Sequence, residues 1–329
     1  MVAFAFSLPW LHRTVVPSHH HVPLRVVVGS SCSQSKYPFW RKRQPTKALS
    51  YLESSASKED TSTPHSETLL SLGLDIHTKS IGFAIVSGWT GQAIRHGMIH
   101  LQHMEGADAF DKVDYVREQL VHLKVDTEQL YKEFIGVNKD ISWVVGVEAY
   151  LFRFLIGQSR AVSLFGLAEL NTLISYECRW IFQRRPFKFH ASKARSWLGL
   201  SQKKQNTQKD IKQIVFDHVH PFLLGFETRY RPRSKAFCST NFDISDAYVA
   251  ARYAIRLEEE KQLLEEYPVV KTSNHSSTRT RRKTVERDKQ LETTIEAQLL
   301  RLEKERIQRS HSEVGHRLNC FVQCHGTNK

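Results

Sequence analysis

The chain has 329 residues, a formal net charge of +13 and an isoelectric point near 9.5, and it is long enough to bury a sizeable hydrophobic core. Its apolar stretches are all interrupted well short of about 18 residues, so the sequence predicts no transmembrane helix. Five scattered cysteines form neither a disulfide framework nor a paired C-x-x-C metal site.

The positive charge is unevenly distributed along the chain. Residues 53–150 hold fifteen acids against eight bases, whereas residues 151–235 hold sixteen bases against five acids. Residues 1–52 contain seven bases and no acid. A basic segment beside clustered carboxylates is typical of proteins that bind a polyanion together with metal ions.

Residues 1–52 have the composition of an organellar transit peptide. They contain scattered Arg and Ser, and no charged segment precedes their apolar start, which disfavours a secretory signal. We therefore expect an organellar protein, in the mitochondrion or the plastid, with the mitochondrion slightly preferred. The alternative is a basic arm that contacts nucleic acid. The Ser/Thr/Glu-rich residues 53–68 are expected to be a linker.

The pattern of apolar residues predicts an α/β domain over residues 69–257. Strands are expected at residues 70–76, 81–86, 93–101, 143–147 and 181–189, and helices at residues 108–134, 159–177, 192–198, 207–218 and 243–257. Because three strands come first and the later strands alternate with helices, we expect a mixed sheet of antiparallel hairpin strands plus parallel strands, flanked by helices. Gly82 is expected to let the backbone of the second strand pass close to another part of the molecule.

Residues 258–329 are expected to form a charged tail that is partly helical and partly disordered. The Ser/Thr/Arg-rich residues 271–283 favour disorder, and residues 285–309 favour a helix with a thin apolar stripe. Such a stripe either packs on a partner helix or belongs to a solvated helix, and the high charge of this segment favours a solvated helix.

Four acidic residues stand where a charge is costly. Asp75 lies in the apolar run of the first strand, Glu148 directly follows residues 143–147, and Asp243 and Asp246 share one face of the last expected helix. Each alone could be a turn or capping residue. Together, such carboxylates would repel one another unless divalent cations neutralised them. We therefore expect two Mg²⁺ or Mn²⁺ ions per site, which can clamp both oxygens of a phosphoryl displacement.

The motifs around these acids resemble those of the RuvC-type Holliday junction resolvases, which have an RNase H-like fold. The segments that carry the resemblance, in the family's order, are residues 72–85 (LGLDIHTKSIGFAI), 144–149 (VVGVEA), 157–170 (GQSRAVSLFGLAEL), 206–215 (NTQKDIKQIV) and 242–255 (FDISDAYVAARYAI). The resemblance implies that Asp75, Glu148, Asp243 and Asp246 bind the metals and that Lys209 assists at the phosphate. It implies a crossover junction endodeoxyribonuclease for branched DNA, and the two-fold character of a junction predicts a homodimer.

Basic and aromatic residues near these motifs are the candidates for nucleic-acid binding. They are Lys79, Tyr150, Phe152, Arg153, Arg160, Lys193, Arg195, Lys203, Lys204 and Lys212. The aromatic residues after Glu148 either stack on bases beside phosphate contacts or belong to the core. His77, in the turn after Asp75, either touches the substrate or has no role, and the pattern favours no role.

Two other functions compete with the resolvase. The first motif, D-x-x-T-K-S-x-G, is closer to the YqgF branch of the same fold, which acts on RNA. That branch lacks the acid that ends the second motif and the paired D-x-x-D, and this chain has both, so the resolvase is favoured over an RNA-directed nuclease. The other alternative is a non-catalytic organellar nucleic-acid-binding protein, which the four intact acids disfavour.

Overall fold

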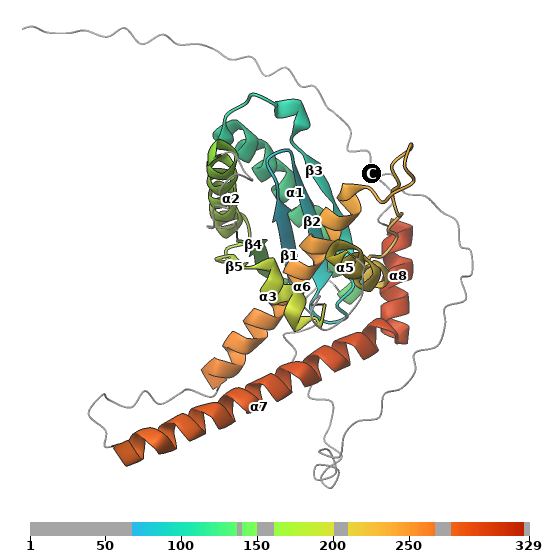
Figure 1. Ribbon diagram of the computed structural model, residues 1–329. Helices are drawn as coiled ribbons and strands as arrows, with labels where there is room; N and C mark the ends of the chain where they lie inside the picture. Colours follow the sequence, from blue (N-terminus) through green and yellow to red (C-terminus); the bar gives the residue numbers. More distant parts are fainter. Residues whose placement is uncertain (1–67, 137–139, 150–160, 201–209, 267–277, 326–329) are drawn as a thin grey trace, which may run out of the picture.

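The structure is a computed structural model that describes residues 68–136, 140–149, 161–200, 210–266 and 278–325 (Figure 1). Its sheet has the order β3-β2-β1-β4-β5 and consists of β1 (Leu69–Ile76), β2 (Ser80–Ser87), β3 (Ala93–His100), β4 (Ser142–Glu148) and β5 (Phe187–Phe189). β1, β2 and β3 pair antiparallel, whereas β4 runs parallel to both β1 and β5. The predicted mixed sheet is confirmed, and its arrangement is that of an RNase H-like fold.

Helices cover both faces of this sheet (Figure 1). One face packs against α1 (Ala109–Ile135) and α2 (Ala161–Ile181), and the other packs against α3 (Ala191–Trp197), α5 (Ile211–Val219) and α6 (Ser239–Glu266). Because side chains alternate along a strand, Leu70, Leu72 and Leu74 of β1 enter the first core, and the residues between them face α6. Asp75 therefore lies on the α6 side of the sheet.

Helix α6 lies directly on the sheet because glycines remove the side chains in its path. A Cβ atom at Gly73 of β1 would lie 1.9 Å from the carbonyl oxygen of Ala247. One at Gly82 of β2 would lie 2.5 Å from the carbonyl oxygen of Asp243, and Gly146 of β4 is equally close to the same helix. The close backbone passage expected at Gly82 is thus confirmed, and the passing segment is α6.

Several bounds differ from the prediction. The strand expected at residues 181–189 is limited to β5, because α2 continues to Ile181. Helix α6 begins at Ser239 rather than at residue 243, so Asp243 lies inside the helix and is not its N-cap. Disorder over residues 271–283 is wrong for the part that is described, since helix α7 begins at Thr278.

The C-terminal region forms two helices, α7 (Thr278–Ser310) and α8 (Glu313–His325). A solvated helix was the favoured prediction for α7, and it is wrong. Ile295 and Leu299 of the apolar stripe are only 6% and 4% exposed. Helix α8 packs against α1, with Leu318 and Val322 buried in the same core as the first face of the sheet. The stripe was visible in the sequence, but a local pattern does not show which surface will cover it.

Buried ion pairs hold α7 against the domain. The Arg306 guanidinium is 3% exposed, donates to the backbone oxygen of Gly88 at 2.7 Å, and pairs with Glu259 of α6 and with Glu303. Arg252 of α6 is also buried and pairs with Glu303. Gly88 lies beside the first residue of β1, so α7 contacts the sheet at the end opposite Asp75.

Candidate metal centre

The four predicted acids lie on three neighbouring elements. Asp75 is next to last in β1 and Glu148 is last in β4. The parallel pairing of these strands brings both residues to one edge of the sheet. Asp243 and Asp246 lie one turn apart in α6, and Asp243 sits against Gly82, the residue that pairs with Asp75 in the sheet. The structure therefore brings all four acids to one place.

The four carboxylates interact electrostatically. Burial, together with the charges of Asp75 and Asp246, raises the pKa of Glu148 to about 7, against the opposing charges of Arg195 and His77. Burial, followed by the charge of Asp75, also raises the pKa of Asp243. The pKa of Asp246 is raised by burial and by Asp75, although Arg195 opposes this shift. Since Asp75 acts on each of the other three, it is the central carboxylate of the group.

His77 lies among these carboxylates, and the sequence analysis assigned it no role. Its Nε2 atom is 3.1 Å from Oδ2 of Asp75 and 3.7 Å from Oδ1 of Asp243. The hydrogen bond with Asp75 is the main cause that raises the pKa of His77 to about 9, with the charges of Asp75, Asp243 and Glu148 acting in the same direction and burial opposing them. The signal in the sequence was the D-x-H spacing, because residues two apart in an extended chain face the same side.

Two cationic side chains border the acids. Arg195 of α3 donates to Oδ1 of Asp246 through Nη2 at 2.7 Å and Nε at 3.2 Å. Lys212, in the first turn of α5, is exposed, and its charge lowers the pKa of both Asp243 and Asp246. Lys212 was predicted only as a nucleic-acid contact, and its position beside the acids also suits it to a phosphate bound there.

The other predicted site residues divide into two groups. Lys193 is exposed on α3, and Lys79 is exposed in the turn between β1 and β2, with its Nζ atom 3.3 Å from Oε1 of Glu105. The remaining candidates lie outside the described residues; they are Tyr150, Phe152, Arg153, Arg160, Lys203, Lys204 and Lys209. The expected transit peptide and all but the last residue of the expected linker also lie there.

Comparisons with known proteins show no family for this chain. A scan against protein-family models and a search of curated proteins each found no match. Among solved structures, the chain is similar to T. thermophilus RuvC in complex with a Holliday junction substrate. The TM-score is 0.37 and the identity 10%, and the match covers 59% of this chain and 96% of that chain.

The residues at this edge of the sheet fit a hard divalent cation. One donor atom from each of Asp75, His77 and Asp243 lies within 4.8 Å of the other two. Carboxylate oxygens are the donors that Mg²⁺ and Mn²⁺ prefer. Because burial and then the neighbouring carboxylates raise the pKa values of Glu148, Asp243 and Asp246, a bound cation would relieve a destabilising arrangement.

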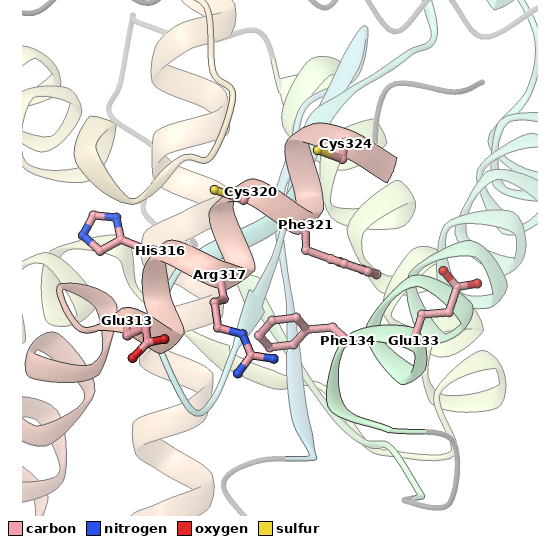
Figure 2. Close-up of a pocket in the computed structure, with 8 residues that line it drawn as sticks. All are labelled: Glu133, Phe134, Glu313, His316, Arg317, Cys320, Phe321 and Cys324. Atoms are coloured by element: carbon pink, nitrogen blue, oxygen red, sulfur yellow. The ribbon is translucent and has the colours of Figure 1, made fainter.

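A separate hollow lies between α1 and α8, away from the acids (Figure 2). Phe134 of α1 and Phe321 of α8 both line it, with their ring centroids 5.7 Å apart. Since α1 leads into the start of β4, whereas Glu148 ends that strand, the hollow is not part of the acidic site.

Among the described residues, no helix combines the length and the apolar character needed to cross a membrane.

Proposed function

We propose that this protein is a metal-dependent endonuclease that resolves four-way DNA junctions, and that it acts as a homodimer in a mitochondrion or plastid. The observation that carries the nuclease activity is the meeting of Asp75, Glu148, Asp243 and Asp246 at one edge of an RNase H-like sheet. The order of the motifs in the sequence supports a junction as the substrate, and the composition of residues 1–52 supports an organelle.

The side chains divide the work of binding and positioning. Asp75, Glu148, Asp243 and Asp246 would hold the metal ions, which when bound supply positive charge to the attacking and leaving oxygens of the phosphodiester. Arg195 fixes the orientation of Asp246 through its two hydrogen bonds. Lys212 is exposed beside Asp243 and can bind a DNA phosphate through its ammonium group. Lys193, exposed on α3, extends the positive surface along which a DNA arm can lie.

Cleavage of defined substrates tests this proposal. The full chain with Mg²⁺ or Mn²⁺ is expected to nick a synthetic four-way DNA junction at symmetric positions and to leave a linear duplex uncut. Asp75→Asn should abolish cutting and spare junction binding, because it removes the central carboxylate and adds no bulk. Asp140→Asn, at an exposed position before β4, is the matched control and should cut like the wild type.

Two outcomes would contradict the proposal. Cleavage of an RNA–DNA hybrid without cleavage of the junction would show an RNA-directed nuclease of the same fold. A wild-type protein that binds the junction and never cuts it with either metal would show a non-catalytic binding protein. Light scattering of the junction complex checks the homodimer, and a fluorescent protein fused to residues 1–52 checks the organelle.

A further inference from the structure

We propose that His77 is a direct ligand of one of the metal ions, together with Asp75 and Asp243, and that its nitrogen donor makes this position prefer Mn²⁺ to Mg²⁺. The inference deepens the proposed metal site and rests on it. A second ion would be held by carboxylates alone, those of Asp75, Glu148 and Asp246. The two metal positions would then differ in their donor atoms.

The distances between the donor atoms support a shared ion. Ligand atoms about 2.1 Å from an octahedral cation lie about 3.0 Å apart when adjacent and about 4.2 Å apart when opposite. The Nε2 atom of His77 lies 3.1 Å from Oδ2 of Asp75 and 3.7 Å from Oδ1 of Asp243, both near or within this range. All three donors lie within 4.8 Å of one another, so a single ion can contact them after small side-chain movements.

The backbone directs the imidazole toward this position. Asp75 and His77 are two residues apart where the chain leaves β1, so both side chains are on the α6 side of the sheet. The backbone N–H of His77 donates to the carbonyl oxygen of Ser80 at 2.9 Å, which fixes the turn. The His77 side chain is 49% exposed, whereas that of Asp75 is 8% exposed, so His77 can adjust its position when an ion arrives from solvent.

The chemistry of the donors determines the preferred metal. Mg²⁺ is bound almost entirely by carboxylate and water oxygens. Mn²⁺ also takes oxygen ligands, but as a first-row transition metal it accepts an imidazole nitrogen more readily than Mg²⁺ does. One nitrogen with two carboxylates therefore favours Mn²⁺ over Mg²⁺, and an all-oxygen set around Asp75, Glu148 and Asp246 suits either ion. Without His77, the first position would also become an oxygen site and would lose its selectivity.

The competing role for His77 is that of a hydrogen-bond partner which leaves when a metal binds. Electron spin-echo spectroscopy separates the two roles, because a nitrogen coordinated to Mn²⁺ has a much stronger hyperfine coupling than an uncoordinated nitrogen nearby. With one equivalent of Mn²⁺, the full-length wild-type protein should show modulation from a histidine nitrogen, and His77→Ala should lose it. His122→Ala, at an exposed histidine of α1, should keep it. A wild type without nitrogen modulation, or a His77→Ala variant that retains it, would overturn the proposal.

Calorimetric titration with each metal alone provides the second measurement. His77→Ala should weaken Mn²⁺ binding about tenfold or more and change Mg²⁺ binding less than about threefold. His77→Gln, which offers an amide oxygen, should likewise lose the preference for Mn²⁺ and guards against a folding defect in the alanine variant. An equal loss of both metals in both folded variants would contradict the proposal.

These results are independent of the nuclease activity. A protein that binds Mn²⁺ through His77 and cuts no DNA would uphold this inference and contradict the proposed function. A protein that cuts junctions and shows no nitrogen modulation would support the proposed function and contradict the role of His77 as a metal ligand.

Discussion

Gly73 of β1 faces the carbonyl oxygen of Ala247 so closely that a methyl group on Gly73 would lie 1.9 Å from that oxygen. A contact this short with backbone cannot be relieved by a side-chain movement. Ala247 directly follows Asp246 in α6, and Gly73 is two residues before Asp75 in β1. The same close approach that packs the helix on the sheet therefore also sets the distance between the carboxylates of the two elements.

Gly73→Ala is predicted to destabilise the fold and to weaken metal binding. The added methyl group must push α6 away from the sheet, and such overpacking costs about 1–3 kcal/mol or more. Urea unfolding measures the stability, and Mn²⁺ titration measures the site. Gly166→Ala is the control, because a Cβ atom there meets nothing within 4 Å and alanine favours the interior of α2 by about 1 kcal/mol. Equal stability of Gly73→Ala and wild type would show that α6 does not rest on β1.

Arg306→Met is predicted to destabilise the protein by about 3–5 kcal/mol, because removing one partner leaves buried charges uncompensated. Arg306 is 3% exposed and contacts Glu259, Glu303 and the backbone of Gly88. Arg301→Met is the matched control: Arg301 is 82% exposed in the same helix, and its pair with Glu305 is of the exposed kind that contributes about 0.5 kcal/mol or less. Urea unfolding compares the two. If both variants lose the same small amount of unfolding free energy, Arg306 does not hold α7 against the domain.

The sequence predicted the sheet because its strands are marked by local patterns. Residues 70–76 and 81–86 are apolar runs bounded by polar breaks, and the later alternation of strands and helices implied the parallel part. The position of α7 could not be predicted, since Arg306 and Glu303 read as ordinary surface charges until α6 and Gly88 are placed against them. The D-x-H spacing places His77 beside Asp75, but its contact with Asp243 could not be predicted because Asp243 is distant in the sequence.

In the metal-free protein, His77 is predicted to remain protonated up to about pH 9, because its hydrogen bond with Asp75 raises its pKa from 6.5 to about 9. Since the folded-state pKa is above the unfolded value, this interaction stabilises the fold fully below pH 6.5, and the contribution is lost as the pH rises through about 9. NMR titration of the imidazole signals in EDTA measures the pKa. Asp75→Asn should lower it by removing the main cause of the shift, and an unchanged pKa in that variant would contradict the contact.

Glu148→Gln is predicted to make the metal-free protein more stable than the wild type at pH 8. Burial and neighbouring carboxylates raise the pKa of Glu148 from 4.5 to about 7 in the folded state. The folded protein therefore binds more protons than the unfolded chain between these two values, so the wild type loses stability as the pH rises from about 4.5 to about 7. Glutamine does not ionise, so the variant does not lose this stability as the pH rises.

Thermal unfolding in EDTA at pH 4 and pH 8 measures this difference. The advantage of Glu148→Gln should be present at pH 8 and nearly absent at pH 4, where Glu148 is mostly protonated in both states. Glu105→Gln, at a carboxylate whose side chain is 79% exposed, should show no comparable gain at pH 8. Adding Mn²⁺ should reverse the order of wild type and Glu148→Gln, because the cation stabilises the ionised carboxylate and the amide is a poorer ligand. A Glu148→Gln protein that is less stable than the wild type at pH 8 in EDTA would contradict the mutual repulsion of the four acids.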